Sequence, residues 1–256
     1  FWGKLFGIRT VISTHSIYHF PKSGLYHALA KHIFLMTDQI LCLSNQSVSE
    51  VVSLDIPASS VHRFTYWVDL EKFKPMSKSV AKKELNWKSK FSVLFVGRLV
   101  KEKGILILDE AACTLKKHGI SVYVAGNGPE FENIKNCILL GPVSQEKLPL
   151  YYNAADVLIV PSIHDEGFGR VILESLACGT PVIGSNRGAI PEAMNETVGK
   201  LIKITPRNIA DTVNYFFSHP TQLAVLSKKA RTFAVSNYSD TNAEQIISVY
   251  EMIEYF

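Results

Sequence analysis

The 256-residue sequence lacks the features that would assign it to several specialised classes of protein. No run approaches the roughly 18 uninterrupted apolar residues of a membrane-spanning helix, so none is predicted. A strong charge of one sign is also missing, because the formal net charge is only +4, too small to indicate nucleic-acid binding. With 47% hydrophobic and 20% charged residues, the composition excludes a disordered or fibrous chain and predicts an ordinary folded core.

Cysteine is scarce, and no CxxC pair is present that would indicate a metal or redox site. The four cysteines, which all lie in apolar segments, are Cys42, Cys113, Cys137 and Cys178. Buried free thiols in a reducing compartment are therefore predicted. No signal-peptide pattern is found, which favours a cytoplasmic location. The chain starts at Phe1 inside an apolar segment, and we expect that upstream residues are absent from it.

Acidic residues are missing from the first part of the chain, up to Asp38. Four basic residues precede it, and a solvated basic face is the simplest interpretation. The basic residues are Lys4, Arg9, Lys22 and Lys31, and the aromatic residues interleaved with them are Phe1, Trp2, Phe6, Tyr18, Phe20 and Tyr26. This mixture also suits peripheral contact with the cytoplasmic face of an anionic membrane or with a phosphorylated acceptor. Low-salt co-sedimentation with anionic vesicles would detect the membrane contact.

What is present is an alternation of apolar strands and helices in two blocks. In the first block we expect strands at 9–14, 39–44 and 61–66, a helix at 25–36, and a short helix capped by Asn45. In the second block we expect strands at 91–96, 121–125, 138–140, 157–160 and 181–184, and helices at 105–118, 146–153 and 170–178. The polar stretch 69–76 reads as a linker. Alternation at these spacings predicts an α/β fold with a doubly wound parallel sheet.

The loop after the strand at 91–96 carries two cations, Arg98 and Lys103, just before a helix. The start of a helix favours anions, and an Arg–Lys pair suits the oxygens of a diphosphate. A solvated basic turn is an equally good alternative. The next such loop begins Gly126-Asn127-Gly128, but the third glycine of a dinucleotide fingerprint is missing. A tight turn between a strand and a helix is predicted there instead.

The segment 164–174 carries the strongest signal, with Glu166 in a glycine-rich loop and Glu174 eight positions later in the helix that this loop opens. Paired glycosidase carboxylates stand about 5–9.5 Å apart, whereas eight helical residues span about 12 Å. The two carboxylates are therefore better placed to hold different parts of one extended ligand. A metal site from His164, Asp165 and Glu166 is not expected, because three adjacent residues rarely converge on one ion. No DxD motif is present for a metal-held diphosphate.

Four segments together resemble the retaining GT-B glycosyltransferases of glycosyltransferase family four: 95–104, 124–130, 140–162 and 166–192. The resemblance implies a GT-B fold with a C-terminal Rossmann-like donor-binding domain at 76–256 and a truncated N-terminal Rossmann-like domain at 1–75. Segment 238–256 resembles the C-terminal helix that returns to the N-terminal domain. The implied activity is transfer of a hexose from a nucleoside-diphosphate sugar to a lipid-linked or glycan acceptor, with retention of configuration.

The resemblance also implies roles for individual residues. Arg98 and Lys103 would neutralise the donor diphosphate without a metal or other cofactor, Glu174 would hold the ribose, and Glu166 would grip the transferred sugar. His15 would face that sugar across the cleft. The implied catalytic set is His15, Arg98, Lys103 and Glu166, and the donor-binding set is Gly97, Arg98, Lys103, Gly141, Val143, Glu166, Gly167, Phe168, Gly169, Arg170, Val171 and Glu174.

Two departures from the family pattern stand out. Tyr66-Trp67 replaces the Asn-Gly of many members, which predicts a reshaped turn before the linker. Family members usually carry more residues upstream, and we expect most of the acceptor-side half to be absent from this chain. The alternative to an enzyme is therefore a non-catalytic nucleotide-sugar-binding module, or a subunit that needs a partner chain for the missing N-terminal half. No nucleic-acid partner is expected.

Overall fold

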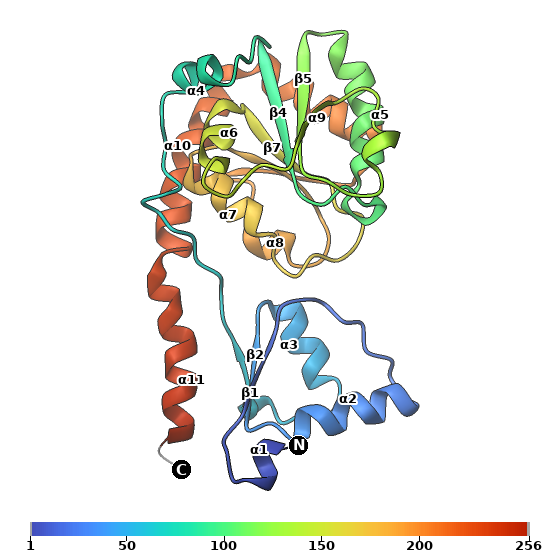
Figure 1. Cartoon of the computed structure of the whole chain (residues 1–256), viewed down its shortest axis with the longest axis vertical. Helices are drawn as coiled ribbons and strands as arrows, with labels where there is room; N and C mark the ends of the chain where they lie inside the picture. Colours follow the sequence, from blue (N-terminus) through green and yellow to red (C-terminus); the bar gives the residue numbers. More distant parts are fainter. Residues whose placement is uncertain (1, 255–256) are drawn as a thin grey trace.

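The computed structural model describes residues 2–254, apart from the side chains of Trp2, Lys4 and Glu254. Of the residues in the predicted basic and aromatic N-terminal face, Phe1 and the side chains of Trp2 and Lys4 thus lie outside the described part. The chain forms two lobes, one above the other in Figure 1, each built on a parallel sheet. This arrangement confirms the predicted α/β fold with Rossmann-like parallel sheets.

The large lobe contains a six-stranded sheet in which every strand pair is parallel. In spatial order the strands are β6 (Ile138–Gly141), β5 (Ile120–Ala125), β4 (Phe91–Val96), β7 (Val157–Val160), β8 (Val182–Ser185) and β9 (Gly199–Ile202). Strand order reverses between β4 and β7, which pair directly through Val93 and Val157. The loops that leave these two strands therefore lie side by side at the carboxyl edge, where sheets of this kind bind ligands.

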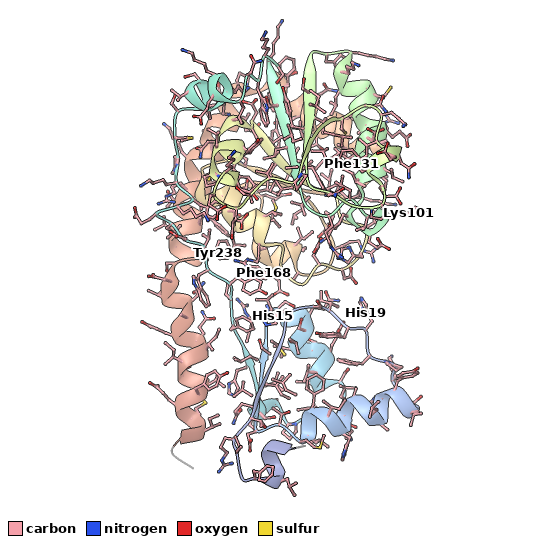
Figure 2. The ribbon with its side chains drawn as sticks, viewed as in Figure 1. His15, His19, Lys101, Phe131, Phe168 and Tyr238 are labelled. Carbon is pink, nitrogen blue, oxygen red and sulfur yellow. The ribbon has the colours of Figure 1, made fainter. Side chains whose placement is uncertain are left out.

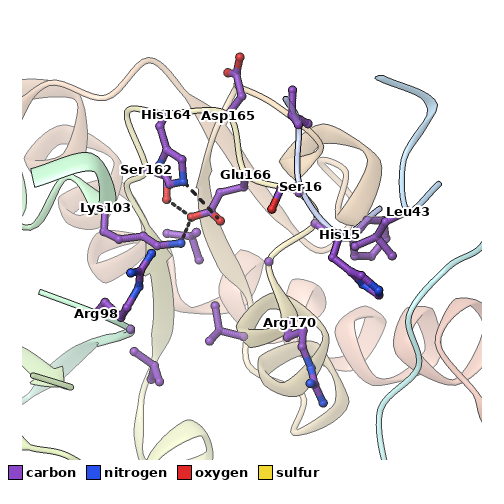
Figure 3. Close-up of a pocket in the computed structure, with 18 of the residues that line it drawn as sticks. His15, Ser16, Leu43, Arg98, Lys103, Ser162, His164, Asp165, Glu166 and Arg170 are labelled. Carbon is purple, nitrogen blue, oxygen red and sulfur yellow. Dashed lines mark hydrogen bonds and ion pairs between the residues drawn. The ribbon is translucent and has the colours of Figure 1, made fainter. Parts of the chain in front are cut away.

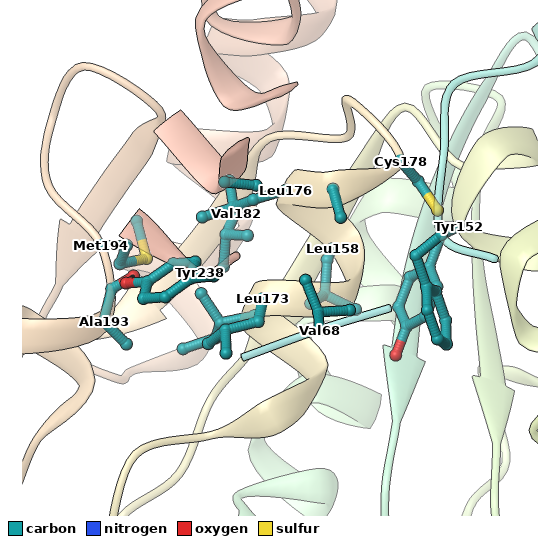
Figure 4. Packing of buried hydrophobic residues seen from close by; sticks show 14 of the residues in the cluster. Val68, Tyr152, Leu158, Leu173, Leu176, Cys178, Val182, Ala193, Met194 and Tyr238 are labelled. Carbon is teal, nitrogen blue, oxygen red and sulfur yellow. Dashed lines mark hydrogen bonds between the residues drawn. The ribbon is translucent and has the colours of Figure 1, made fainter. Parts of the chain in front are cut away.

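Helices cover both faces of this sheet (Figure 1). One face carries α5 (Ile105–Lys116) and α9 (Pro206–Ser218), and the other carries α6 (Leu148–Ala154), α7 (Arg170–Ala177) and α10 (Pro220–Asn237). The smaller helices are α4 (Lys78–Glu84) and α8 (Ile190–Ala193), with 3₁₀ turns η2 (Lys101–Lys103) and η3 (Phe131–Asn133). Figure 4 shows the apolar layer under α7, where the Tyr238 hydroxyl donates a hydrogen bond to the Ala193 carbonyl at 2.5 Å. Apolar residues on both sides of the sheet explain why its strands read as continuous hydrophobic runs.

The small lobe holds a three-stranded sheet in the order β1 (Val11–Thr14), β2 (Gln39–Cys42) and β3 (Val61–Arg63). Its helices are α1 (Trp2–Leu5), α2 (Leu25–Leu35) and α3 (Asn45–Val52), followed by the 3₁₀ turn η1 (Ala58–Ser60). The predicted cap of α3 was wrong by one residue. Ser44, which has an extended backbone, is the N-cap, and its hydroxyl accepts from the Ser47 N–H at 3.1 Å.

The C-terminal part of the chain returns to the small lobe. After α10, the 3₁₀ turn η4 (Asp240–Ala243) leads into α11 (Glu244–Glu254), which runs alongside the small lobe in Figure 1. The Gln245 side chain accepts from the Thr65 N–H at 2.8 Å, and the Asn242 amide donates to the Tyr66 carbonyl at 3.1 Å. The two lobes are thus joined twice, by the linker and by this helix. The exact domain limits at 75 and 76 stay a prediction.

The cysteines are all free thiols, but the prediction that all four are buried was wrong. Cys42 and Cys178 are buried, whereas Cys113 lies on the exposed side of amphipathic α5 and Cys137 is half-buried. Within residues 2–254, no helix has the length and apolar character needed to cross a membrane. Peripheral contact of the basic N-terminal face with a membrane stays a prediction.

Asp109 on α5 holds the segment 135–137, which leads into β6, against this helix. Its buried carboxylate accepts from the backbone N–H groups of Lys135, Asn136 and Cys137 at 3.1, 2.7 and 3.0 Å. Burial alone would raise the pKa of Asp109, but these donors outweigh it and hold the pKa below its ordinary value. The carboxylate therefore stabilises the edge of the large sheet in its charged form.

We expect Asp109→Asn to lower the free energy of unfolding by about 1–2 kcal/mol at neutral pH, because charge-assisted hydrogen bonds are lost. The depressed pKa gives the sign: this stabilisation is present above the unfolded pKa of about 3.9 and is lost as pH falls through the folded value. In urea unfolding, the difference in the free energy of unfolding between the unmodified chain and Asp109→Asn should therefore become smaller at acid pH. Asp211→Asn, which alters only an exposed pair with Arg207, is the matched control. An equal effect of the two substitutions would contradict this role of Asp109.

Candidate functional site

A pocket of about 560 Å³ opens at the carboxyl edge of the large sheet, facing the small lobe. It is lined by the loops that leave β4 and β7, by the start of α7, and by residues 15–17 and Tyr66 of the small lobe. In Figure 3, Arg98 and Lys103 lie on one side of this pocket and His15 on the other, with Glu166 between them. We refer to it below as the central pocket.

Close backbone contacts hold the loops around the central pocket together. Gly104 has a φ of +69°, and a Cβ there would lie 1.9 Å from the Pro161 carbonyl oxygen. A Cβ on Gly167 would lie 2.2 Å from the His15 carbonyl oxygen, so at this point the two lobes touch. Only glycine permits both approaches. Figure 2 shows the consequence, with His15 of the small lobe facing Phe168 of the large lobe.

Glu166 is a buried carboxylate in the lining of the central pocket, with an exposed fraction of only 8%. Its carboxylate forms an ion pair with the Lys103 ammonium and accepts from the Ser162 hydroxyl at 2.5 Å. His164 Nε2 lies 3.9 Å from the other oxygen. Burial would raise the pKa of Glu166, but Lys103, and then Ser162, hold it below its ordinary value. Glu166 is therefore a carboxylate at neutral pH and acts only as a hydrogen-bond acceptor.

Arg98 connects the central pocket to a second hollow of about 330 Å³, which also involves Asn127 and Val143. Gly126 packs closely against the backbone next to Arg98, since a Cβ on Gly126 would lie 1.9 Å from the Gly97 carbonyl oxygen. This packing, rather than dinucleotide binding, explains the glycine. The predicted tight turn is followed by the 3₁₀ turn η3 instead of an α-helix.

Glu174 faces a third hollow, of about 270 Å³, which the linker and Arg170 also line. The Tyr152 hydroxyl donates to Glu174 Oε2 at 2.7 Å, and burial raises the pKa of this carboxyl group. Glu166 and Glu174 therefore face different spaces on the two sides of Arg170. This separation supports the interpretation that the two carboxylates hold different parts of an extended ligand. It does not suit a glycosidase pair, whose two carboxylates flank one scissile bond.

The three adjacent residues that could suggest a metal site point to different partners. His164 Nδ1 contacts the Glu102 carbonyl at 3.0 Å, whereas Asp165 accepts from Arg187 Nε at 3.1 Å and pairs with His19 Nε2 at 2.9 Å. No group of three or more His, Cys, Asp and Glu residues in the described part of the chain is arranged to hold a metal ion. Asp165 instead links the two lobes through His19.

Most of the predicted site residues come together. Those that line the central pocket are His15, Gly97, Arg98, Lys103, Glu166, Gly167, Phe168, Gly169, Arg170 and Val171. Val143 and Glu174 line the neighbouring hollows. Gly141 lines none of the three, and its carbonyl accepts from the Gly126 N–H at 2.9 Å. Sequence reasoning missed Ser162, whose signal is its position two residues after the end of the apolar strand β7.

A two-lobed α/β protein with cations and a buried carboxylate at the switch point of its sheet has the architecture of a GT-B transferase. The family model of group 1 glycosyl transferases matches residues 77–233. The chain belongs to this family.

Among its relatives, D-inositol 3-phosphate glycosyltransferase of Saccharomonospora viridis is 30% identical over 238 residues, 83% of this chain and 55% of that protein. The GPI3 subunit of phosphatidylinositol N-acetylglucosaminyltransferase of Saccharomyces cerevisiae is 26% identical over 204 residues, 73% of this chain and 45% of that protein. The crystal structure of Anabaena HepE in complex with UDP superimposes with a TM-score of 0.86 at 18% identity, over 99% of this chain and 74% of that one. The chain thus spans about half the length of the curated relatives it matches.

Proposed function

We propose that this chain is the donor-binding part of a retaining glycosyltransferase, which transfers a hexose from a nucleoside-diphosphate sugar to a lipid-linked or glycan acceptor. The observation that carries the proposal is the central pocket, where Arg98 and Lys103 face the same space as Glu166 at the switch point of the sheet. The pocket has cations for a diphosphate and, beside them, an ionised acceptor for sugar hydroxyls. The family membership and the HepE complex with UDP support a nucleotide-sugar donor.

In the proposed reaction the bond between the anomeric carbon and the diphosphate breaks, and a bond from that carbon to the acceptor oxygen forms. The acceptor proton passes to the departing phosphate, so no group of the chain need become covalently attached to the sugar. Arg98 and Lys103 stabilise the negative charge that grows on the leaving diphosphate, which a metal ion does in other enzymes. Glu166 orients the sugar, and Glu174 holds the ribose in its separate hollow.

We propose that the acceptor binds on the side of the central pocket that the small lobe forms. The names of two relatives refer to D-inositol 3-phosphate and to phosphatidylinositol, which supports a phosphorylated or lipid-linked acceptor. One of these relatives is named as a subunit, which supports the second candidate, a chain that works with a partner. In both cases the proposed donor site is the same.

The test is calorimetric titration of the chain with UDP, GDP and ADP and with UDP-glucose and GDP-mannose, in the presence of a metal chelator. We expect micromolar binding of one nucleotide and its sugar, and loss of that binding in Glu174→Ala, because the ribose loses a buried acceptor. Micromolar binding that disappears with the chelator would overturn the metal-free site. No binding of any nucleotide would overturn the donor site in this chain.

A further inference from the structure

Tyr66 lies where the small lobe meets the central pocket, just after β3, and it is half-buried. Its hydroxyl is 2.6 Å from His15 Nδ1, and the two rings are stacked with centroids 5.8 Å apart and an interplanar angle of 18°. Neither Tyr66 nor Trp67 has a positive φ, so the pair occupies ordinary backbone. What Tyr66 adds is a contact with His15, and His15 lines the pocket.

The large lobe holds the same tyrosine ring. The Arg170 guanidinium carbon lies 5.6 Å from the Tyr66 ring centroid, a cation–π distance. Phe168 meets the ring edge-on at 6.2 Å and 87°, and Phe64 does so at 6.0 Å and 80°. Tyr66 is thus clamped between its own lobe and the loop that carries Glu166. Because Arg170, Phe168 and Phe64 hold the Tyr66 ring in place, Tyr66 can in turn hold the orientation of His15, to which its hydroxyl is hydrogen-bonded.

The state of the Tyr66 phenol bears on which partner donates the hydrogen bond to the other. Burial raises the pKa of Tyr66, so the phenol keeps its proton at neutral pH, and the Arg170 charge only partly opposes this shift. The phenol can therefore donate to Nδ1. A neutral imidazole that accepts at Nδ1 carries its own proton on Nε2. His15 then offers an N–H donor, and sugar hydroxyls and ring oxygens are acceptors for it.

We propose that Tyr66 is a positioning residue that fixes His15 as the Nε2–H tautomer facing the sugar of the donor, and that it couples this orientation to Arg170 of the opposite lobe. This inference rests on the proposed function, because it assigns the sugar end of the donor site. It concerns a different set of contacts from those of the diphosphate end, where Arg98 and Lys103 lie. The two ends can therefore be measured separately in one protein.

The test is the ratio of the dissociation constants of a nucleoside diphosphate and its nucleotide sugar, UDP and UDP-glucose or GDP and GDP-mannose. Tyr66→Phe should leave nucleotide affinity unchanged and weaken the sugar preference roughly three- to ten-fold, the effect of one hydrogen bond. His15→Ala should do the same, and the double variant should lose no more than His15→Ala alone. Tyr215→Phe, which removes a hydroxyl bonded to Gln222 on α10, is the control.

Nitrogen-15 NMR of the His15 ring gives a second readout that a merely structural tyrosine would not move. We expect the Nε2–H tautomer in the unmodified chain and a shift of the Nδ1 signal in Tyr66→Phe, with the other histidines unchanged. Nucleotide binding with an unaltered sugar preference in Tyr66→Phe, or additive losses in the double variant, would overturn the inference alone. Failure of the unmodified chain to bind any nucleotide would overturn the proposed donor site, and the inference with it.

Discussion

Arg98→Ala should weaken the binding of the nucleoside diphosphate roughly 10- to 100-fold. Arg98 lines both the central pocket and the neighbouring hollow, so its guanidinium can reach a diphosphate that bridges them. Hydrogen bonds from a charged donor contribute about 1.5–3 kcal/mol, which corresponds to this loss in affinity. The measurement is calorimetric titration with the nucleotide that the unmodified chain binds, at several salt concentrations. The affinity of the unmodified chain should fall with salt, and that of the variant should fall less.

Lys101→Ala is the matched control for Arg98→Ala. Lys101 carries the same charge in the same loop, but it is exposed and lines none of the hollows described above. Its removal should change nucleotide affinity less than two- to three-fold, as expected for an exposed surface charge outside the site. Equal losses in the two variants would mean that general positive charge, and not a site at Arg98, attracts the nucleotide.

The strands of the large sheet could be predicted closely because local signals agree there. The apolar run Phe91–Val96 ends at a glycine, and the structure gives β4 these same bounds. The loops after β4 and β7 could also be assigned to one site, since parallel strands present their carboxyl ends at one edge. Arg98, Lys103 and Glu166 therefore follow from topology together with charge.

Contacts between distant segments could not be predicted in this way. Arg231 on α10 points inward and donates to the carbonyls of Phe73 and Ala177 at 2.8 and 3.0 Å, which places a charge on a face that a simple pattern would make apolar. The hydrogen bond between His15 and Tyr66 joins residues 51 positions apart, and no local sequence pattern predicts it. The division of the proposed donor site into hollows likewise depends on Arg170, which lines both the central pocket and the hollow at Glu174.

Glu166→Gln should have opposite effects on the two ends of the donor. The Glu166 carboxylate now pairs with Lys103, so a diphosphate must compete with it for the ammonium group. The neutral amide releases Lys103, and we expect nucleoside-diphosphate affinity to be unchanged or to rise a few-fold. The sugar loses a charged acceptor, and its hydrogen bonds are worth about 1.5–3 kcal/mol. The preference for nucleotide sugar over nucleotide should therefore fall roughly 10- to 100-fold, and sugar transfer should fall at least as much.

Glu102→Gln makes this comparison rigorous, because it removes the same charge from an exposed position next to Lys103. Glu102→Gln should raise nucleotide affinity slightly, because it removes one negative charge that repels the diphosphate, and it should leave the sugar preference unchanged. Loss of both nucleotide and sugar binding in Glu166→Gln would mean that the carboxylate holds the loop and does not touch the sugar. Thermal unfolding of the same variants separates these cases, because a loop-holding role lowers the melting temperature and a sugar-holding role does not. A selective loss of sugar preference in a stably folded variant would assign Glu166 to the transferred sugar and Lys103 to the diphosphate.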